Sequence, residues 1–385
     1  MYHSLNNPHQ LIDRQQTYTL NKKILTIHSE DRDMCKWPFS NSFAIECPEI
    51  YFNIQTMRLV DVALPQNQDV FNNEYQNTKL SFSLYPRNPA SVYYYPLATN
   101  VNSSYIITIQ DGTYTAEQLA NELQNKLNKA VNDYLITQGS YPTYLNFKVY
   151  YDQVGNCLYF GNTEDEFTFE FSKRIVYTLS QCDQPIVFDR CTQWGLPWHL
   201  GFCQTNYTST ALLKSNGDDD IIFYYKKQDS PDYVWLAAGD PTPSYFIKAP
   251  TSLKISGDIA IYLEIERYNY MDELTPYAST NRNGDYYGGK VNSAFVKIPI
   301  TSKTPNYMYD GTNFFINNSG FYIPPIDKIS RFKFKFRYHD GRLVNFKDDP
   351  FTFSIEINQI RNDMDKSYSI KAPVIYNGKI TNYTL

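Results

Sequence analysis

The sequence predicts a mainly β protein, an antiparallel sandwich with one inserted helix. Short runs that alternate apolar and polar residues recur along its 385 residues, and a period of two places the apolar side chains on one face of a strand. Tyr (35) and Phe (24) are abundant, whereas 19% of the residues are charged. This composition is typical of half-buried pleated surfaces and of protein contacts. The length allows one large β body or several domains, so a second sandwich stays open as an alternative.

The strongest strand pattern lies between residues 329 and 360. Its even positions carry aromatic residues and its odd positions carry basic ones, which are Phe332, Phe334, Phe336 and Tyr338 against Arg331, Lys333, Lys335 and Arg337. The pair Asp340-Gly341 follows, and these residue types tolerate the positive φ of a tight turn. A second alternation then carries Phe351, Phe353, Ile355 and Ile357 in one phase. Together the two runs predict a hairpin with one core face and one polar face.

Residues 1–40 are predicted to form an extended N-terminal arm, because they are mostly polar apart from the short apolar segment 24–27. The β body is predicted to span 41–365. Its first strand changes phase before Pro65. Phe52 and Ile54 lie at even positions, and the next apolar residues are in mixed phase: Met57, Leu59, Val62 and Leu64. One extra residue in a strand produces such a change, so a bulge or bend is predicted here.

One segment, about 115–135, is predicted to be an amphipathic helix. Thr115 and Gln118 have the spacing of a capping box, and apolar residues recur every four positions, at Leu119, Leu123, Leu127, Val131 and Leu135. This stripe must pack on a sheet. Alternating runs at 145–151, 158–160 and 167–171 then predict a meander, so helix and meander form an insertion over 111–172.

The rest of the body is less regular. Residues 174–250 are rich in Trp, Pro and Asp, which predicts long loops with short strands. Strands are predicted again at 259–265 and 296–300, separated by a Gly- and Asn-rich surface loop at 281–289. Residues 366–385 are predicted to be a C-terminal tail whose short apolar motifs suit pairing with another chain.

Charge and cysteine usage limit the classes of function. The formal net charge of -5 gives no global field that would attract nucleic acid or anionic lipid. The polar N-terminus lacks the apolar core of a secretion signal, and no apolar run has the length of a membrane span, so a protein that is soluble and not secreted is expected. Six scattered cysteines favour a reducing compartment over a disulfide scaffold.

Few residues have the pattern of a chemical site. The nearest approach to a metal site is the set Cys182, Cys191, His199 and Cys203, but it lacks the close C-x-x-C pairs of structural zinc sites, so ordinary cysteines are expected. The run Asp218-Asp219-Asp220 is interpreted as a solvated acidic turn. Hydrolase and nucleotide-binding motifs are absent from the sequence. No catalytic residue, metal or cofactor is therefore predicted, and the protein is not expected to be an enzyme.

The basic row at Arg331, Lys333, Lys335 and Arg337 has two interpretations. Its charges are about 7 Å apart along a strand, so they could contact phosphates or an acidic neighbouring subunit. Alternatively, the row is a solvated face that discourages edge pairing. No aromatic residues interleave on the same face as they do in single-strand binders, which favours the solvated face. The row is retained as a candidate subunit contact.

Several segments resemble virion proteins of nucleocytoplasmic large DNA viruses, namely the minor capsid proteins of chlorovirus- and mimivirus-like particles. The segments are LTIHSEDRD, FAIECPEIYFNIQTMRLVDVALPQ, DGTYTAEQLANELQNKLN, WGLPWHLGF and FYIPPIDKISRFKFKFRYHDGRLVNFKDDPFTFSIEINQI. The resemblance runs in patches from about Leu25 to Ile360. It implies a jelly-roll type of sandwich and a minor capsid protein that bridges or cements major capsid capsomers through β surfaces and terminal arms.

The same resemblance implies the partners and the location. The expected partners are the major capsid protein and other minor capsid proteins, with self-association as a further option. A small-molecule substrate and nucleic acid are not expected, and contact with an inner viral membrane is left open. The expected location is the capsid shell of the virion, assembled in the host cytoplasm.

Two other classes of function remain as alternatives. The first is a virion glycan- or receptor-binding module, which exposed aromatic side chains around Trp194, Trp198 and Trp235 would favour. The second is a carboxylate-dependent hydrolase on a β scaffold, which a paired Asp/Glu in a cleft would favour.

Overall fold

The computed structural model describes residues 18–100, 104–172, 193–223, 233–274, 291–300, 307–310, 319–362, 374–376 and 379–381. It is mainly β with antiparallel ladders and few helices, as predicted. The predicted surface loop at 281–289 and most of the predicted tail at 366–385 lie outside the described residues. Within the tail, β20 (Val374–Tyr376) pairs with β21 (Lys379–Thr381).

The chain forms two compact units. Unit 1 combines Met1–Gln66, Ala260–Glu273 and Asn292–Leu385, and unit 2 combines Asn67–Ile259 with Leu274–Val291. Where the sequence predicts one body over 41–365, the chain therefore divides, because residues between 67 and 259 enclose a hydrophobic core of their own. The predicted insertion at 111–172 is one part of unit 2.

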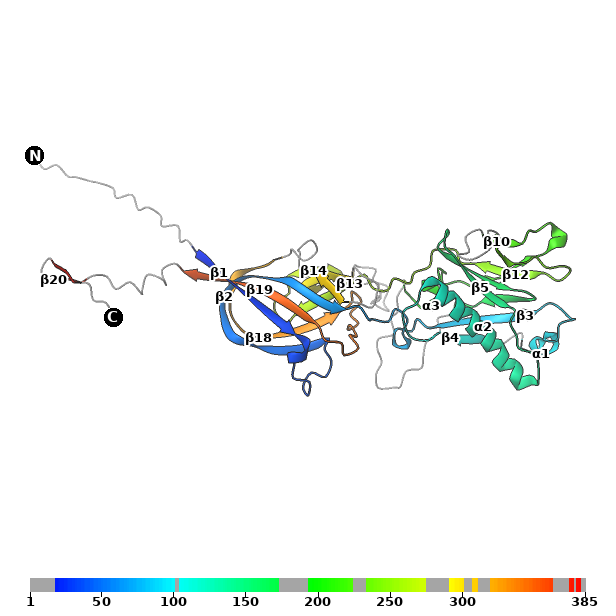
Figure 1. The fold of residues 1–385 in the computed structure, drawn as a ribbon, viewed down its shortest axis with the longest axis horizontal. Helices are drawn as coiled ribbons and strands as arrows, with labels where there is room; N and C mark the ends of the chain where they lie inside the picture. Colours follow the sequence, from blue (N-terminus) through cyan, green and yellow to red (C-terminus); the bar gives the residue numbers. More distant parts are fainter. Residues whose placement is uncertain are drawn as a thin grey trace, which may run out of the picture. The chain divides into compact units, whose positions relative to one another are not determined.

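Unit 1 is built on a seven-stranded antiparallel sheet (Figure 1). Its strand order is β1 (Tyr18–His28), β19 (Thr352–Asn362), β2 (Ser42–Pro65), β18 (Gly320–Arg337), β13 (Ala260–Ile265) and β16 (Val296–Pro299), with β17 (Tyr307–Asp310) also pairing with β2. The short strands β14 (Met271–Leu274) and β15 (Val291–Ala294) form a separate pair, and η1 (Ser29–Asp31) follows β1. The first and last long strands of the chain thus lie side by side in one sheet.

The predicted hairpin between β18 and β19 is wrong, because β2 lies between them in the sheet. The turn at Asp340-Gly341 exists, with Gly341 at φ 93°, but it closes only a short return in which Val344 N–H donates to Phe336 O over 3.1 Å. The chain then crosses to the other edge of β2. The predicted burial is confirmed: the aromatic face of β18 and the apolar face of β19 both enter the core.

The predicted bulge in β2 is confirmed. Asp61 pairs with Ser354 and Leu59 pairs with Ile355, so Val60 is an extra residue without its own partner on β19. One extra residue reverses the alternation. Leu59 and Val62 therefore both point into the core of unit 1, although they are three positions apart.

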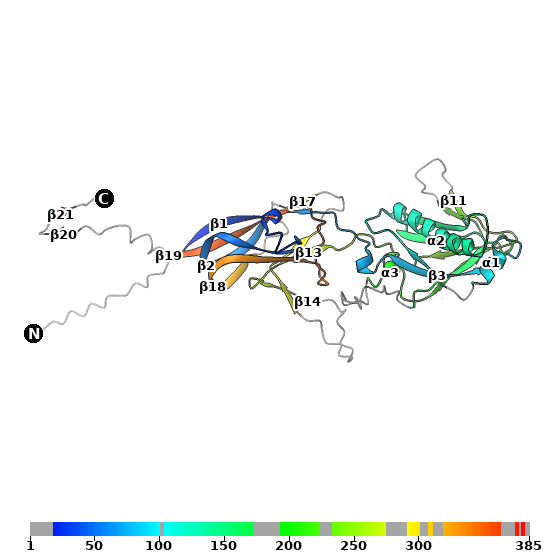
Figure 2. The ribbon, with the colours of Figure 1, turned by 90° about the horizontal axis from the view of Figure 1, so that it is seen from below.

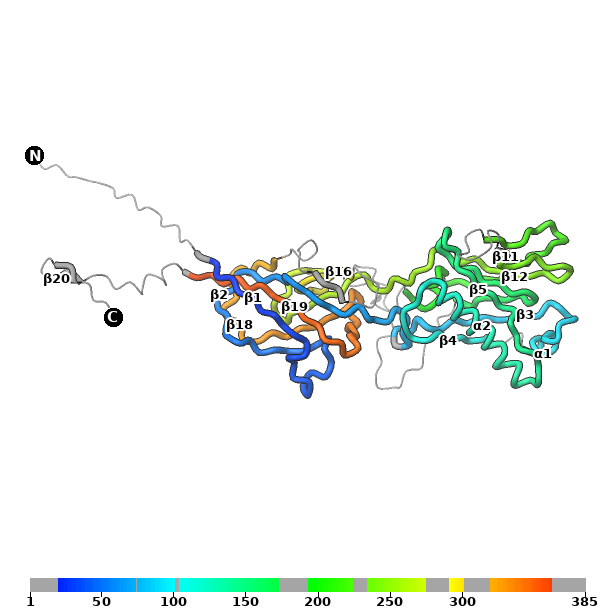
Figure 3. Tube along the Cα trace, in the orientation of Figure 1, coloured from blue at the N-terminus to red at the C-terminus, as the bar shows by residue number. Residues whose placement is uncertain are grey.

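Unit 2 has two four-stranded sheets around one core (Figures 2 and 3). One sheet has the order β4 (Tyr105–Thr108), β3 (Lys79–Pro86), β7 (Asp165–Phe169), β8 (Tyr207–Thr208); the other has the order β5 (Phe147–Asp152), β6 (Cys157–Asn162), β12 (Ser244–Lys248), β9 (Thr210–Leu212). The remaining elements are short: η2 (Asn73–Tyr75), α1 (Tyr94–Ala98), α3 (Leu196–His199), η3 (Lys214–Asn216), β10 (Ile221–Phe223) and β11 (Tyr233–Leu236). Where residues 174–250 are described, their strands are the short elements β8 to β12.

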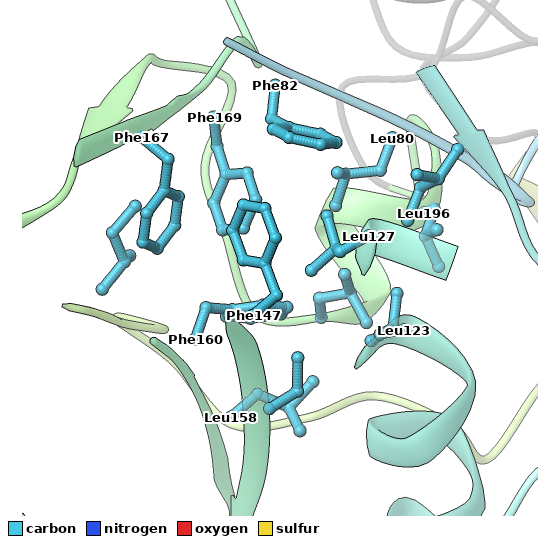
Figure 4. Close-up of a cluster of buried hydrophobic side chains, with 14 of the residues drawn as sticks. Leu80, Phe82, Leu123, Leu127, Phe147, Leu158, Phe160, Phe167, Phe169 and Leu196 are labelled. Atoms are coloured by element: carbon cyan, nitrogen blue, oxygen red, sulfur yellow. The ribbon is translucent and has the colours of Figure 1, made fainter. Parts of the chain in front are cut away.

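The predicted helix is α2 (Ala116–Gln138), and Thr115 with Gln118 forms the capping box. Its apolar stripe is buried, and Leu123 and Leu127 face Phe residues of the two sheets (Figure 4). Asn128 adds a contact that the sequence pattern does not reveal: its Nδ2 donates to Phe147 O and its Oδ1 accepts from Phe147 N–H, both over 3.0 Å. This pair of bonds fixes the helix against β5.

A buried acid lies in the core of unit 2. The Asp165 side chain is 2% exposed and its Oδ2 accepts a 2.7 Å hydrogen bond from the Tyr144 hydroxyl. Asn162 Nδ2 donates to that hydroxyl over 2.8 Å, and Asn162 Oδ1 accepts from Asp165 N–H. Burial raises the pKa of Asp165 to about 6, although the bond from Tyr144 opposes the rise.

We expect Asp165 to make unit 2 less stable as the pH rises. The pKa of Asp165 is about 6 in the folded state, above the ordinary value of about 3.9. Protonated Asp165 therefore adds about 2 to 3 kcal/mol to the free energy of unfolding below pH 4, and this addition is lost between pH 4 and 6. Asp165→Asn should flatten this slope. Urea unfolding followed by tryptophan fluorescence measures it, since Trp194, Trp198 and Trp235 lie in unit 2. Identical pH slopes for both proteins would contradict the assignment.

Candidate subunit-contact surface

The basic row of β18 lies on the outer face of the unit 1 sheet, opposite its buried aromatic face. Arg331 and Lys333 are exposed and Lys335 is partly exposed. Each of these three side chains meets a carboxylate on a neighbouring strand or the turn beyond it: Arg331 with Glu46 at 3.6 Å, Lys333 with Glu266 at 3.1 Å and Lys335 with Glu264 at 3.6 Å. The row is therefore an ion-pair ladder rather than a track of uncompensated positive charge, and such exposed pairs add little stability.

Lys333 has a second contact within unit 1. Its ammonium lies 5.9 Å from the centre of the Trp37 ring, within the range of a cation–π interaction. Its hydrogen bond and charge also lower the pKa of Glu266. The ladder thus has fixed partners within its own unit, and a neighbouring subunit would meet alternating charges along it.

Arg337 does not share this exposed surface, which corrects the sequence interpretation of the row. Its side chain is 2% exposed and forms ion pairs with Glu264 and Glu273, while its guanidinium carbon lies 5.2 Å from the centre of the Tyr262 ring. Alternation along β18 does place it in phase with Lys335. It is nevertheless covered, because β13 and β14 supply both carboxylates and the ring.

The edge strand β1 provides a different kind of contact surface. It is the terminal strand of the described sheet and pairs along its whole length with β19, from Tyr18 opposite Asn362 to His28 opposite Thr352. Residues 18–28 of the predicted arm are therefore part of the sheet. Leu20 and Ile24 of this strand are 56% and 59% exposed.

The backbone of β1 has a second side that no strand of the described residues pairs with. Ser29 N–H donates to Phe351 O over 2.9 Å, and backbone groups alternate between the two sides of an antiparallel strand. The N–H groups of the odd residues of β1 therefore face β19. Those of the even residues, including Leu20 and Ile24, face the open edge of the sheet.

A buried carboxylate anchors β1 to the sheet. The carboxylate of Glu356 on β19 forms ion pairs with Lys22 Nζ at 2.6 Å and with Arg58 Nη2 at 2.9 Å. Asn358 Nδ2 also donates a hydrogen bond to it over 2.9 Å. Burial alone would raise the pKa of Glu356, but the hydrogen bonds from Arg58, Lys22 and Asn358 outweigh burial and lower it to about 2. Lys22 is thus engaged in holding β1, and the open edge keeps a fixed geometry.

The candidate metal ligands are not brought together where they are described. Cys182 and Cys191 lie outside the described residues, and Cys203 is exposed. His199 is buried, with Nδ1 2.8 Å from Lys254 O and Nε2 3.5 Å from Asn77 Nδ2. Among the residues that the structure describes, no group of three or more His, Cys, Asp or Glu could hold a metal ion.

The acidic run and the tryptophans have structural roles. Asp218 and Asp220 accept the backbone N–H groups of Leu213 and Ala238 at 3.1 and 2.8 Å. Trp194 and Trp235 are buried, at 5% and 2% exposure, and Trp198 is half-buried with Lys254 Nζ 4.8 Å from the centre of its ring. These three tryptophans therefore do not form an exposed aromatic cluster of the kind that would favour a glycan-binding module. Within the described part of the chain, no helix has both the length and the apolar character to cross a membrane.

Comparisons with known proteins find distant likenesses among solved structures. No family model and no curated protein sequence matches the chain. Among solved structures, it is similar to the penton protein of mavirus, with a TM-score of 0.38 and 9% identity over 88% of this chain and 99% of that one. It is also similar to a chain of the Sputnik virophage structure, with a TM-score of 0.39 and 11% identity over 91% of this chain and 99% of that one. At these values neither likeness assigns a family.

Proposed function

We propose that this chain is a structural component of an icosahedral large DNA virus capsid, a minor capsid protein that bridges or cements major capsid capsomers. The sequence segments that resemble such proteins support the proposal. Its partners are then the major capsid protein and other minor capsid proteins, and its location is the virion, assembled in the host cytoplasm. Its role is to join subunits, without catalysis.

The observation that carries the proposal is the open edge of β1. β1 has eleven residues and no second partner strand within the described part of the chain, so it is long enough to accept a full strand from another chain. Natural proteins usually protect such an edge. Here it is instead anchored by the Glu356 contacts and carries two exposed apolar side chains, Leu20 and Ile24. A strand from a capsid neighbour would cover all of these groups.

The ion-pair ladder of β18 gives a second contact surface in this proposal. Arg331, Lys333 and Lys335 face solvent beside their carboxylate partners. A neighbouring subunit that presents acidic and basic side chains in turn could form ion pairs with both. Such contacts select a partner and a register more than they add affinity. Arg337 is excluded from this surface by its burial.

We expect Ile24→Pro to exclude the protein from capsids while leaving the monomer folded. Proline removes the N–H of residue 24, which faces the open edge, and a strand tolerates proline where its N–H faces solvent. The measurement is the copy number of the variant in purified virions, by quantitative mass spectrometry, beside its melting temperature as an isolated protein. The expected result is loss from particles with a melting temperature near that of the wild type.

Two control variants separate the edge from its side chains. Ile24→Thr keeps the N–H and removes apolar surface, so it should reduce incorporation less than Ile24→Pro. Leu25→Pro removes an N–H that faces β19 and should unfold part of unit 1. Normal incorporation of folded Ile24→Pro protein would eliminate strand addition at β1. Truncations that test the termini should stop at residue 17, because Lys22 belongs to the sheet.

A further inference from the structure

The open side of β1 contrasts with an edge strand of unit 2 that is capped. β5 is the terminal strand of its sheet, and side chains of α2 bond to its backbone. Asn128 bonds to both backbone groups of Phe147 over 3.0 Å, and Gln124 Oε1 accepts Val149 N–H over 3.1 Å. β1 pairs with β19 and with no other described strand. Its second side is therefore the place where a further strand can be added to unit 1.

The C-terminal strands β20 and β21 form a two-stranded sheet of their own. Their register places Tyr376 opposite Lys379, with two residues between them in the sequence. Those residues are Asn377 and Gly378, the pair that most favours a two-residue turn. A two-stranded hairpin alone is marginally stable in water, and a third strand stabilises it. Each copy of the chain thus carries a hairpin that gains stability by joining another sheet.

The backbone of β20 has one side that β21 does not use. The two residues that flank a two-residue turn bond to each other, so the backbone groups of Tyr376 face β21. Backbone groups alternate between the two sides of a strand. Those of Ile375 therefore face away from β21, where they can bond to a further strand, as those of Ile24 can on the open side of β1.

We infer that the β20–β21 hairpin of one copy adds to the β1 edge of a second copy of this chain. Within one chain the hairpin and the edge are not paired with each other in the described residues, so every copy carries one donor and one acceptor. Residues 363–373 tether the hairpin to the end of β19, and eleven residues span up to about 36 to 40 Å. The main-chain hydrogen bonds of strand addition then join the two copies. This inference rests on the proposed role of β1 as a strand acceptor and names its partner.

Analytical ultracentrifugation of the full-length protein tests the inference. Over about 1 to 300 µM, the wild-type protein should associate in a concentration-dependent way. Ile24→Pro removes an N–H of the acceptor edge and Ile375→Pro removes the N–H on the free side of β20, so each should raise the dissociation constant at least about tenfold. Ile24→Thr and Ile375→Thr keep these N–H groups, and each should weaken association less than its proline counterpart. Circular dichroism checks that every variant is folded.

A mixture of the two proline variants distinguishes this contact from a symmetric one. Ile24→Pro protein keeps its hairpin, and Ile375→Pro protein keeps its edge. Donor and acceptor are different surfaces, which makes the contact heterologous. An equimolar mixture should therefore form a heterodimer, although neither variant associates by itself.

Three results would overturn the inference. The first is a wild-type protein that stays monomeric, and the second is a mixture that stays monomeric while the wild type associates. The third is a monomeric wild type in which Ile375→Pro speeds amide exchange in β1, which would place the hairpin on its own edge. The proposed function is tested separately in virions. If Ile24→Pro protein is lost from virions while Ile375→Pro protein enters them normally, β1 accepts a strand of another protein and only this inference fails.

Discussion

Phe334→Asp should unfold unit 1. The Phe334 side chain is fully buried, and its ring centre lies 5.0 Å from that of Phe353, 5.5 Å from Phe43 and 5.7 Å from Phe332. The substitution removes these ring contacts and places a carboxylate among apolar side chains without a partner. The combined cost is expected to exceed about 4 kcal/mol, which is comparable with the whole stability of many domains.

Lys333→Ser is the matched control for this prediction. Lys333 neighbours Phe334 in the strand but points to solvent, where its ion pair with Glu266 and its contact with Trp37 are weak. Its loss should change the free energy of unfolding by about 0.5 kcal/mol or less. Urea unfolding, monitored through the hydrogen exchange of the β18 amides, measures the free energy of unfolding of the two variants. Similar losses for both would show that the faces of β18 are assigned wrongly.

The elements that the sequence predicts correctly depend on local signals. The capping box of α2 joins residues three apart, and its apolar stripe repeats every four residues, so both are visible in one window of sequence. The faces of β18 and β19 are visible for the same reason, since alternation is a property of a single strand. The bulge at Val60 also leaves a local mark, because it reverses the phase of neighbouring apolar residues.

Strand partners depend on contacts that no local signal records. Asp340-Gly341 does form a turn, but nothing in its sequence tells that the chain will cross β2 and reach the far edge. Residues 18–28 are polar enough to be interpreted as an arm, yet they form β1 because Glu356 and the backbone of β19 meet them there. Both differences arise from pairing between segments that are hundreds of residues apart.

The candidate subunit-contact surface was also predicted only in part, for the same reason. The alternation along β18 correctly predicts that Arg331 and Lys333 are exposed. Their surroundings are set by their own strand and by the strands beside it. Arg337 has the same phase but lies where β13 and β14 cover the strand, and its partner Glu264 is 73 positions away.

Arg337→Met should destabilise unit 1 strongly, even though Arg337 lies in the same row as the exposed basic residues. Its guanidinium pairs with Glu264 and Glu273, and the Glu273 side chain is only 9% exposed. Methionine fills much of the same volume but leaves both carboxylates without their guanidinium partner. Removing one partner of a buried ion pair costs about 3 to 5 kcal/mol, because the remaining charge keeps its desolvation penalty.

Two further variants test this cause. Arg331→Met removes an exposed charge from the same strand and should cost about 0.5 kcal/mol or less, since its pair with Glu46 at 3.6 Å faces solvent. The triple variant Glu264→Gln, Glu273→Gln and Arg337→Met removes the two carboxylate charges that have lost their guanidinium partner, and should recover much of the loss. Thermal melting with hydrogen exchange of β18 compares all three proteins. If the triple variant is no more stable than Arg337→Met alone, the loss comes from packing around the long side chain, and the buried-charge explanation is wrong.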